Sequence, residues 1–407
     1  MANRSQQLTR YPQPDGGQKE VEGVRRIISC LTVGAVLLSN GCAWMPPTRI
    51  ADGMRATDFS YLITGTNQGI TLRPQPTVSN KGIKVPKKGI NVTYFGSGGA
   101  LIERGDAAIL LAPFMSHHYY FRLEFWKTKP ETATINSILQ PYKQQLKSVR
   151  AVLLGHGHYD HLLDVPELVP KFSPAATVYG SNTVVNTLSP TGLAIQSVSG
   201  FAERPGERGR WTVTNDSIRF MAISSDHAPN LLGRSIAKGS TGRELVQLPK
   251  KSGGWKLGET FAYMIDFLDP KKCVDPKKAC KDAIVFRIYY QDAGKSPEDF
   301  HTLVKNLNGA SEHGIDLAIL CVASFEEARA TSFAAANLYP EAAKQVLEAK
   351  QYMLGHWENF WRDHTLELGK LRAIPFNDPR EFVTRLEQAQ PPGAVWAMPL
   401  PGTTLSY

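Results

Sequence analysis

The sequence lacks three features that would assign it to a familiar class of binding or membrane protein. No run of Arg or Lys is interleaved with aromatic residues, so the net charge of +9 is interpreted as diffuse and no nucleic-acid partner is expected. No internal repeat is visible, so nothing indicates a repeat architecture. The apolar run IISCLTVGAVLL near the N-terminus is too short to span a membrane.

Histidine is also scarce, with ten residues in a chain of 407. The rest of the composition is ordinary: 42% hydrophobic and 20% charged residues are typical of a packed globular protein. The length suits one large α/β domain. Any local concentration of histidine is therefore informative.

The N-terminal segment is predicted to be a targeting signal. Arg25 and Arg26 precede an apolar run of the length found in secretory signals, and that run ends in LLSNGC, which resembles the lipobox of bacterial lipoproteins. The resemblance implies cleavage before Cys42 and lipidation of that cysteine. Residues 1–41 are then leader and signal, and the protein is a membrane-anchored lipoprotein of the cell envelope that faces the periplasm or the exterior. An uncleaved N-terminal anchor is the alternative, and it also places the remaining chain outside the cytoplasm.

The cysteines fit such a location. Cys273 and Cys280 flank a turn-forming Asp-Pro in CVDPKKAC, and in an oxidising compartment they could form a disulfide. Cys321 lies in the apolar run DLAILCVASF and is interpreted as a thiol of the core, with a ligand role as the alternative.

Residues 42–87 are rich in Pro, Gly, Thr and Asn and are predicted to be a tether or wrapping extension. Residues 88–407 are predicted to form the folded domain, in which strands come first and then alternate with helices. This order favours layered sheets with helices outside them. The expected strands are 89–96, two within 100–114, 148–154, 217–224, 258–267, 283–290 and 316–323, and the expected helices are 131–146, 296–307, 339–350 and 378–389.

One stretch, GHGHYDHLLD at residues 155–164, follows a predicted strand directly. It places His156, His158, Asp160 and His161 on a turn, where neighbouring side chains can converge on one point. Neutral imidazole and carboxylate are ligands that zinc and similar ions accept. The alternative, a set of unconnected surface histidines, does not account for such a compact array.

Further candidate ligands follow other apolar runs: His227 in SSDHAP, Asp292 in QDAG and His356 in GHWENF. Strand ends at one edge of a sheet would bring such residues together. Taken singly, each has an ordinary alternative, either a capping Asp or a hydrogen-bonded His.

Together these motifs resemble the metallo-β-lactamase superfamily, because HGHYDH is followed in order by DH, QDAG and GHW. The layout is similar to the branch that contains N-acyl phosphatidylethanolamine-hydrolysing phospholipase D and bacterial lactonase-type hydrolases, over about residues 88–390. The resemblance implies an α/β fold, an αββα sandwich of two mixed β-sheets with outer helices. The sequence departs from the family pattern at two places: Ala112-Pro113 stands where Asp-Pro is common, and Glu358 stands where glycine is common.

The resemblance also implies two divalent metal ions, with zinc the expected metal. One metal is expected on His156, His158 and His227, and the other on Asp160, His161 and His356. Asp292 is expected to bridge them.

The implied function is hydrolysis of a phosphodiester, lactone or other ester by a hydroxide bridged between the two metals, with Asp160 orienting it as the catalytic residue. The expected partners are a small-molecule or lipid-like ester and the membrane. Two alternatives stay open, a metal-dependent oxidoreductase of the same fold and a surface lipoprotein that binds metal or a partner without turnover.

Four further polar residues are candidates for supporting roles. Asp164 and Asp226 could orient imidazoles or cap loops, and His117 and His118 could face the pocket or pack on the surface.

Overall fold

The computed structural model describes only part of the chain, and all of the described residues belong to one compact unit, Gly53–Tyr407. The described residues are 71–73, 89–118, 127–215, 217–227, 237–273, 275–277, 280–293, 313–323, 348–361, 373–374, 382, 386 and 395–407. The predicted leader at 1–41 lies outside them. Among the described residues, no helix is both long and apolar enough to cross a membrane.

The first sheet has eight strands in the order β1-β15-β2-β3-β4-β5-β6-β7. Pairing is antiparallel from β1 to β4 and parallel from β4 to β7, so the sheet is mixed. The strands are β1 (Thr71–Arg73), β2 (Asn91–Gly96), β3 (Gly99–Arg104), β4 (Ala107–Leu111), β5 (Val149–Leu153), β6 (Thr177–Gly180), β7 (Ile195–Ser197) and β15 (Thr404–Ser406).

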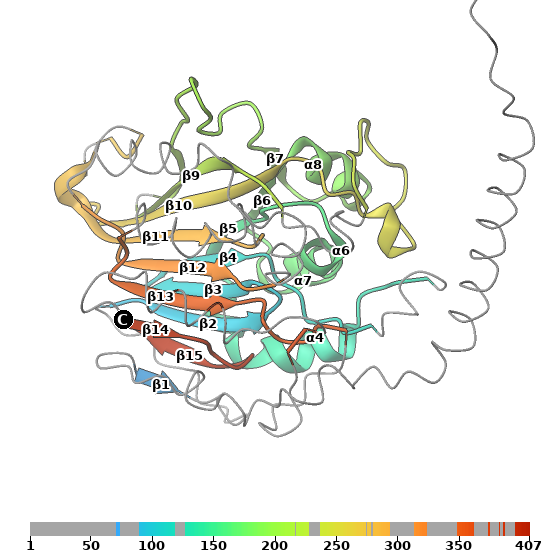
Figure 1. Cartoon of the computed structure of the whole chain (residues 1–407), viewed down its shortest axis with the longest axis horizontal. Coiled ribbons are helices and arrows are strands. Elements are labelled where there is room, and N and C mark those ends of the chain that lie inside the picture. The colour runs from blue at the N-terminus through green and yellow to red at the C-terminus, as the bar shows by residue number, and fades with distance from the viewer. Residues whose placement is uncertain are drawn as a thin grey trace, which may run out of the picture. The chain divides into compact units, whose positions relative to one another are not determined.

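The second sheet has seven strands in the order β14-β13-β12-β11-β10-β9-β8. Pairing is antiparallel from β8 to β11 and parallel from β11 to β14. The strands are β8 (Thr212–Asn215), β9 (Ile218–Ser225), β10 (Thr260–Leu268), β11 (Ile284–Gln291), β12 (Leu317–Cys321), β13 (Gln351–Gly355) and β14 (Val395–Ala397). Figure 1 shows the strands of the two sheets overlaid in one view.

The described helices are short and follow strands of the first sheet. They are α4 (Thr132–Leu139), α5 (Lys143–Leu146), α6 (Tyr159–Leu162), α7 (Val165–Phe172) and α8 (Asn182–Leu188), with 3₁₀ turns η2 (Gln140–Tyr142), η3 (Ser189–Thr191), η4 (Ser252–Gly254) and η5 (Lys281–Ala283). The helix predicted over 131–146 is divided into α4, η2 and α5, because Pro141 in the first turn of η2 cannot donate to a continuous helix.

The other predicted helices fall mainly outside the described residues. Residues 296–307 are not described, and only Phe382 and Leu386 of the 378–389 segment are, both of them helical. The helix predicted over 339–350 does not reach its expected end, since residues 348–350 are not helical.

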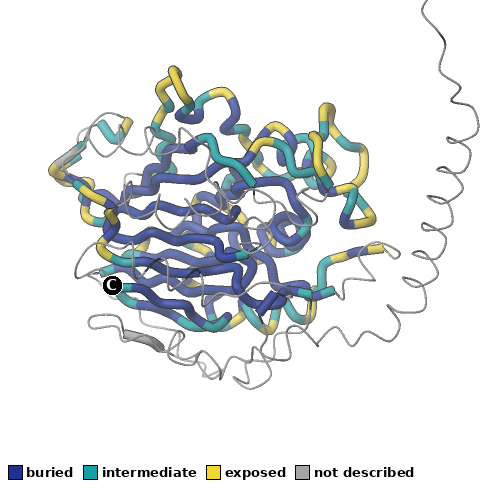
Figure 2. The backbone as a smooth tube through the Cα atoms, viewed as in Figure 1, coloured by how far each residue is buried: buried dark blue, intermediate teal, exposed yellow. Residues whose placement is uncertain are grey.

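The core lies between the sheets and continues beyond the second one. Phe261, Tyr263 and Ile265 of β10 pack into the larger cluster, which also contains the apolar residues of the first sheet. Ala262 and Met264 face a smaller cluster on the opposite side of β10. All of β10 is therefore buried, and Figure 2 shows the same burial along most strands of both sheets. The predicted α/β sandwich of two mixed sheets with helices is confirmed.

Part of the predicted extension at 42–87 pairs with the domain, because Thr71–Arg73 forms β1 against β15. Its other residues lie outside the described ones, so the domain boundaries stay a prediction.

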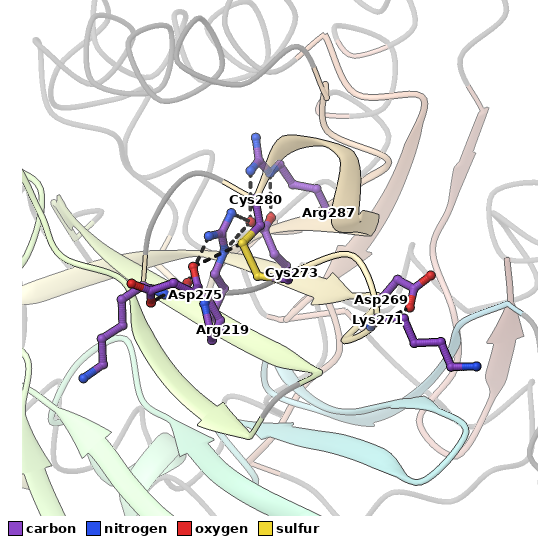
Figure 3. The surroundings of a disulfide bond; sticks show 10 residues. Arg219, Asp269, Lys271, Cys273, Asp275, Cys280 and Arg287 are labelled. Atoms are coloured by element: carbon purple, nitrogen blue, oxygen red, sulfur yellow. Dashed lines mark hydrogen bonds and ion pairs between the residues drawn. A yellow bond between two sulfur atoms is a disulfide. The ribbon is translucent and has the colours of Figure 1, made fainter.

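The predicted disulfide is confirmed: Cys273 and Cys280 are bonded, with their Cα atoms 5.4 Å apart (Figure 3). They lie in the connection from β10 to β11. Arg219 donates to the carbonyl of Pro276 inside this loop at 3.0 Å. Cys321 is free and buried in the core, as predicted.

Candidate metal centre

The HGHYDH stretch follows strand β5 and runs through a turn into a short helix, which separates its ligands into two pairs. β5 ends at Leu153, and α6 begins at Tyr159, after His158 in an extended conformation. His156 and His158 therefore come from the turn, whereas Asp160 and His161 come from the single turn of α6. The amide of His161 donates to the carbonyl of His158 at 3.1 Å, which closes the start of the helix.

The glycine between the first two histidines allows close packing against the second sheet. The amide of Gly157 donates to the carbonyl of Leu257 at 2.8 Å, and a Cβ at position 157 would collide with the carbonyl of Lys256. A larger residue would push the His-Gly-His turn away from the segment that enters β10.

The remaining candidate ligands come from ends of strands in the second sheet. His227 lies two positions beyond β9, and Asp292 and His356 directly follow β11 and β13. Because β11, β12 and β13 are parallel, Asp292 and His356 reach the same edge of the sheet.

His156, His158 and His227 form a first group of possible metal ligands. Their donor atoms lie within 4.8 Å of one another, and their ring centroids are 4.7 to 4.8 Å apart. Burial, followed by the neighbouring imidazoles, holds the pKa of His158 well below its usual value. His158 is therefore neutral at neutral pH and keeps the lone pair that a metal needs.

Asp160, His161 and His356 form a second group, also within 4.8 Å. The Oδ2 of Asp160 lies 3.5 Å from the Nε2 of His161 and 3.3 Å from the Nε2 of His356. Burial alone would raise the pKa of Asp160, but the two imidazoles hold it well below the ordinary value. Burial lowers the pKa of His161 to about 4. The pKa of His356 is raised, because the hydrogen bond and charge of Asp160 outweigh burial.

Asp292 joins the two groups. Its Oδ1 lies 3.1 Å from the Nδ1 of His156, and its Oδ2 lies 3.6 Å from the Nδ1 of His161. The carboxylate is fully buried, which would raise its pKa, yet the two imidazoles hold that pKa well below the ordinary value. An ionised carboxylate thus stands between the groups.

The residues of these groups fit divalent cations. Three of the candidate ligands have a buried imidazole nitrogen with no hydrogen-bond partner among the described residues, namely Nε2 of His156, Nδ1 of His161 and Nδ1 of His356. The donor set is imidazole nitrogen and carboxylate oxygen, which suits zinc and related transition metals. The structure brings all of the predicted ligands together, and their role as ligands stays a prediction.

Asp164, Asp226 and His118 were further candidates for the site, and the structure gives the contacts of each. Asp164 accepts the amides of Met115 and Ser116 at 2.6 and 2.8 Å, so it anchors the loop after β4 and does not orient an imidazole in these contacts. Asp226 accepts the amide of His227 at 2.8 Å. His118 contacts the carbonyl of Lys129 through Nε2 at 2.8 Å.

Aromatic side chains flank the second group. The Phe360 ring lies 5.0 Å from the His356 ring, and Phe114 contacts Phe360 and Tyr159 edge to face at 6.5 and 5.9 Å. Trp361 donates its indole N–H to the hydroxyl of Tyr159 at 2.9 Å. His117 contacts the Phe360 carbonyl at 3.2 Å, and burial lowers its pKa to about 4.

Two buried residues beside His356 were not predicted to contribute to the site, Tyr94 and Glu358. Tyr94 lies in a predicted strand with no motif around it. The only signal for Glu358 was its departure from the glycine of the family pattern.

Residues 129–265 match the family model described as Beta-lactamase superfamily domain. This part of the chain is therefore similar to that domain. The match includes the whole HGHYDH stretch and His227 and ends before Asp292 and His356. The chain also resembles a UPF0173 metal-dependent hydrolase of Chelativorans sp. (strain BNC1), at 25% identity over 173 residues. That similarity covers 42% of this chain and 63% of the relative.

Solved structures with a similar fold have low sequence identity to the domain. Igni18, a metallo hydrolase from Ignicoccus hospitalis, is 14% identical with a TM-score of 0.43, covering 79% of this chain and 99% of that one. CmlA, a diiron β-hydroxylase from Streptomyces venezuelae, is 12% identical with a TM-score of 0.43, covering 79% of this chain and 55% of that one. At such low sequence identities and TM-scores, the structural similarity supports no inference about activity.

Proposed function

We propose that the chain is a metal-dependent hydrolase that uses two divalent cations, with zinc the expected metal, to cleave a phosphodiester, lactone or other ester. The observation that carries the proposal is the pair of donor groups joined by the buried carboxylate of Asp292. The similarity to the Chelativorans relative, a metal-dependent hydrolase by name, agrees with it.

Divalent cations held at this site would lower the pKa of bound water and polarise the bond that is cleaved. In this chain His156, His158 and His227 would hold one cation, and Asp160, His161 and His356 the other. Asp160 has a strongly lowered pKa and is ionised at neutral pH. It can therefore orient the attacking water by accepting its hydrogen bond.

The surroundings of the second group favour a substrate with an apolar part. Phe360 contacts His356, while Tyr159 and Trp361 are only partly buried and are joined by a hydrogen bond. Aromatic surface beside a few polar groups is typical of sites for small organic ligands. A lipid-like ester agrees with this surface, and so does the resemblance to the phospholipase D and lactonase-type branch.

We also propose that the protein acts at the cell envelope, anchored through a lipidated Cys42. The lipobox-like LLSNGC supports this location. The disulfide between Cys273 and Cys280 supports an oxidising compartment, because such bonds are rare in reducing ones.

The experiment uses purified protein, metal analysis by mass spectrometry, and a panel of phosphodiesters, lactones and carboxylic esters with short and long acyl chains. We expect two metals per chain, turnover of at least one class, and loss of that turnover with a chelator followed by recovery with zinc. Metal binding without turnover would contradict an enzyme. Oxygen consumption that depends on iron would favour the oxidoreductase alternative.

A further inference from the structure

The backbone of His356 is held by a buried hydrogen-bond chain that starts on the other sheet. The hydroxyl of Tyr94, on β2, accepts the amide N–H of His356 at 2.6 Å. The same hydroxyl donates to Oε2 of Glu358 at 2.6 Å. The amide of Ser97 donates to the other carboxyl oxygen of Glu358. Tyr94, Ser97 and Glu358 are all fully buried, so water does not compete for these bonds.

The contact lies where the backbone adopts an unusual conformation. His356 has a φ of 58°, in the left-handed region that residues other than glycine seldom occupy. The ring of Tyr94 packs on the preceding residue, because a Cβ added to Gly355 would lie 3.2 Å from its Cε2. Tyr94 therefore contacts the chain on both sides of the Gly355–His356 peptide bond. Such a conformation persists only where surrounding contacts determine it.

This conformation decides where the imidazole of His356 points. Its Nε2 lies 3.3 Å from Oδ2 of Asp160, within the second donor group. A different φ at His356 would rotate the side chain away from Asp160. The hydroxyl of Tyr94 therefore acts on the geometry of the second group without being one of its ligands.

Glu358 is a costly residue to bury at this position. No Lys or Arg pairs with it among the described residues, and its described partners are the hydroxyl of Tyr94 and the amide of Ser97. A buried carboxyl that pairs with no Lys or Arg costs free energy that an apolar residue of similar volume would avoid. Glu358 orients the hydroxyl of Tyr94: it accepts the O–H hydrogen, so that a lone pair of the oxygen faces the amide of His356.

We propose that Tyr94 and Glu358 are positioning residues that set the metal affinity of the second group, Asp160, His161 and His356. The proposal rests on the two-metal function proposed above. Partners that orient a ligating histidine from behind typically change metal affinity 10- to 100-fold when they are removed. Here the contact is made to the backbone of the ligand and not to its ring.

The test compares zinc affinity and stoichiometry in wild type, Tyr94→Phe, Glu358→Gln and Tyr142→Phe, measured by competition with a chromogenic chelator. Tyr142→Phe is the matched control, since Tyr142 is an equally buried tyrosine whose hydroxyl faces the carbonyl of Gly402. We expect Tyr94→Phe to weaken binding of the second zinc about 10- to 100-fold and to leave the first unchanged. Glu358→Gln should weaken the same site less, because the amide keeps the shape and one acceptor oxygen. Tyr142→Phe should match wild type.

Absorption spectra of the cobalt(II)-loaded proteins provide a second readout, and the bands from the second site alone should change in Tyr94→Phe. Unchanged binding of both metals in Tyr94→Phe would overturn the proposal, and so would equal weakening of both sites. If Tyr94→Phe does not fold, Glu358→Gln decides, and wild-type affinity in that variant overturns the proposal. A wild-type protein that binds only one zinc would instead contradict the proposed function itself.

Discussion

The carboxylate of Asp292 occupies the space that a side chain at Gly155 would need. The amide of Gly155 donates to Oδ2 of Asp292 at 3.1 Å, and a Cβ built on Gly155 would collide with the same carboxylate. Gly155 follows β5 of the first sheet and Asp292 follows β11 of the second. The absence of a side chain at one strand end thus allows a ligand from the other sheet to reach between the donor groups.

Gly155→Ala should displace Asp292 and damage the centre without unfolding the protein. The backbone at Gly155 does not have a positive φ, so the steric collision with Asp292 is the main effect. We expect lower metal content and turnover reduced about 100-fold, as misplacement by about 1 Å can cause. Gly200→Ala is the matched control, because nothing lies within 4 Å of its added Cβ. Wild-type metal content and turnover in Gly155→Ala would contradict the bridging position of Asp292.

Asp160→Asn should impair the second donor group and leave the first intact. The amide keeps the size of the side chain but loses the charge that faces His161 and His356. We expect the first metal to be retained, the second to be depleted, and turnover to fall about 100-fold or more. His156→Ala should instead empty the first site. Metal stoichiometry and turnover of both variants, prepared identically, check this, and Asp160→Asn with both metals and near-normal turnover would contradict the role of Asp160.

The candidate ligands could be predicted from the sequence because four of them lie together in one short motif and the other three lie just past apolar runs. His156 and Asp292 follow predicted strands, whereas His356 follows only the short apolar run YMLG, which forms most of β13 and was not predicted as a strand. The long buried strands were found from their apolar runs. Strands of three or four residues, such as β6, β7 and β14, have no clear alternation and are formed by pairing with their neighbours.

The contacts behind the ligands could not be predicted, because they join distant segments. Tyr94 and Glu358 are 264 positions apart, and neither side chain is a candidate metal ligand that a motif search would single out. Asp164 follows the histidine cluster and was a candidate to orient an imidazole, yet it accepts amides 48 and 49 positions earlier. Only the packing of the sheets decides which polar group meets which ligand.

Cys42→Ala should release the protein from the membrane fraction. If the cysteine is lipidated, acyl chains supply the anchoring, and its removal also blocks signal processing. Fractionation of cells and the mass of the isolated protein measure both effects. Unchanged membrane retention and mass would contradict the lipobox and leave the uncleaved anchor as the explanation.

The buried carboxyl group of Glu103 should make the free energy of unfolding decrease as the pH rises. Burial raises its pKa from 4.5 to about 8, so between these values the folded protein holds a proton that the unfolded chain releases. With respect to this group, stability is therefore greatest below about pH 4.5 and decreases until the pH exceeds about 8. Urea unfolding across this range should show a smaller decrease for Glu103→Gln than for wild type. Glu207→Gln, at a side chain that is 73% exposed, should behave like wild type. Parallel curves for wild type and Glu103→Gln would contradict the raised pKa.

The disulfide should stabilise the fold without contributing to turnover. Cys273 and Cys280 close a loop between residues seven positions apart, which by the chain-entropy estimate is worth about 2 to 3 kcal/mol. The loop precedes β11, whereas Asp292 follows that strand, so the bond lies at the end opposite the donor groups. A Cys273→Ser, Cys280→Ser double variant should therefore unfold at lower urea and keep wild-type metal content and turnover. Reduction of the wild type should reproduce the loss of stability. A tenfold loss of turnover in the folded double variant with full metal content would show that the loop affects the metal centre.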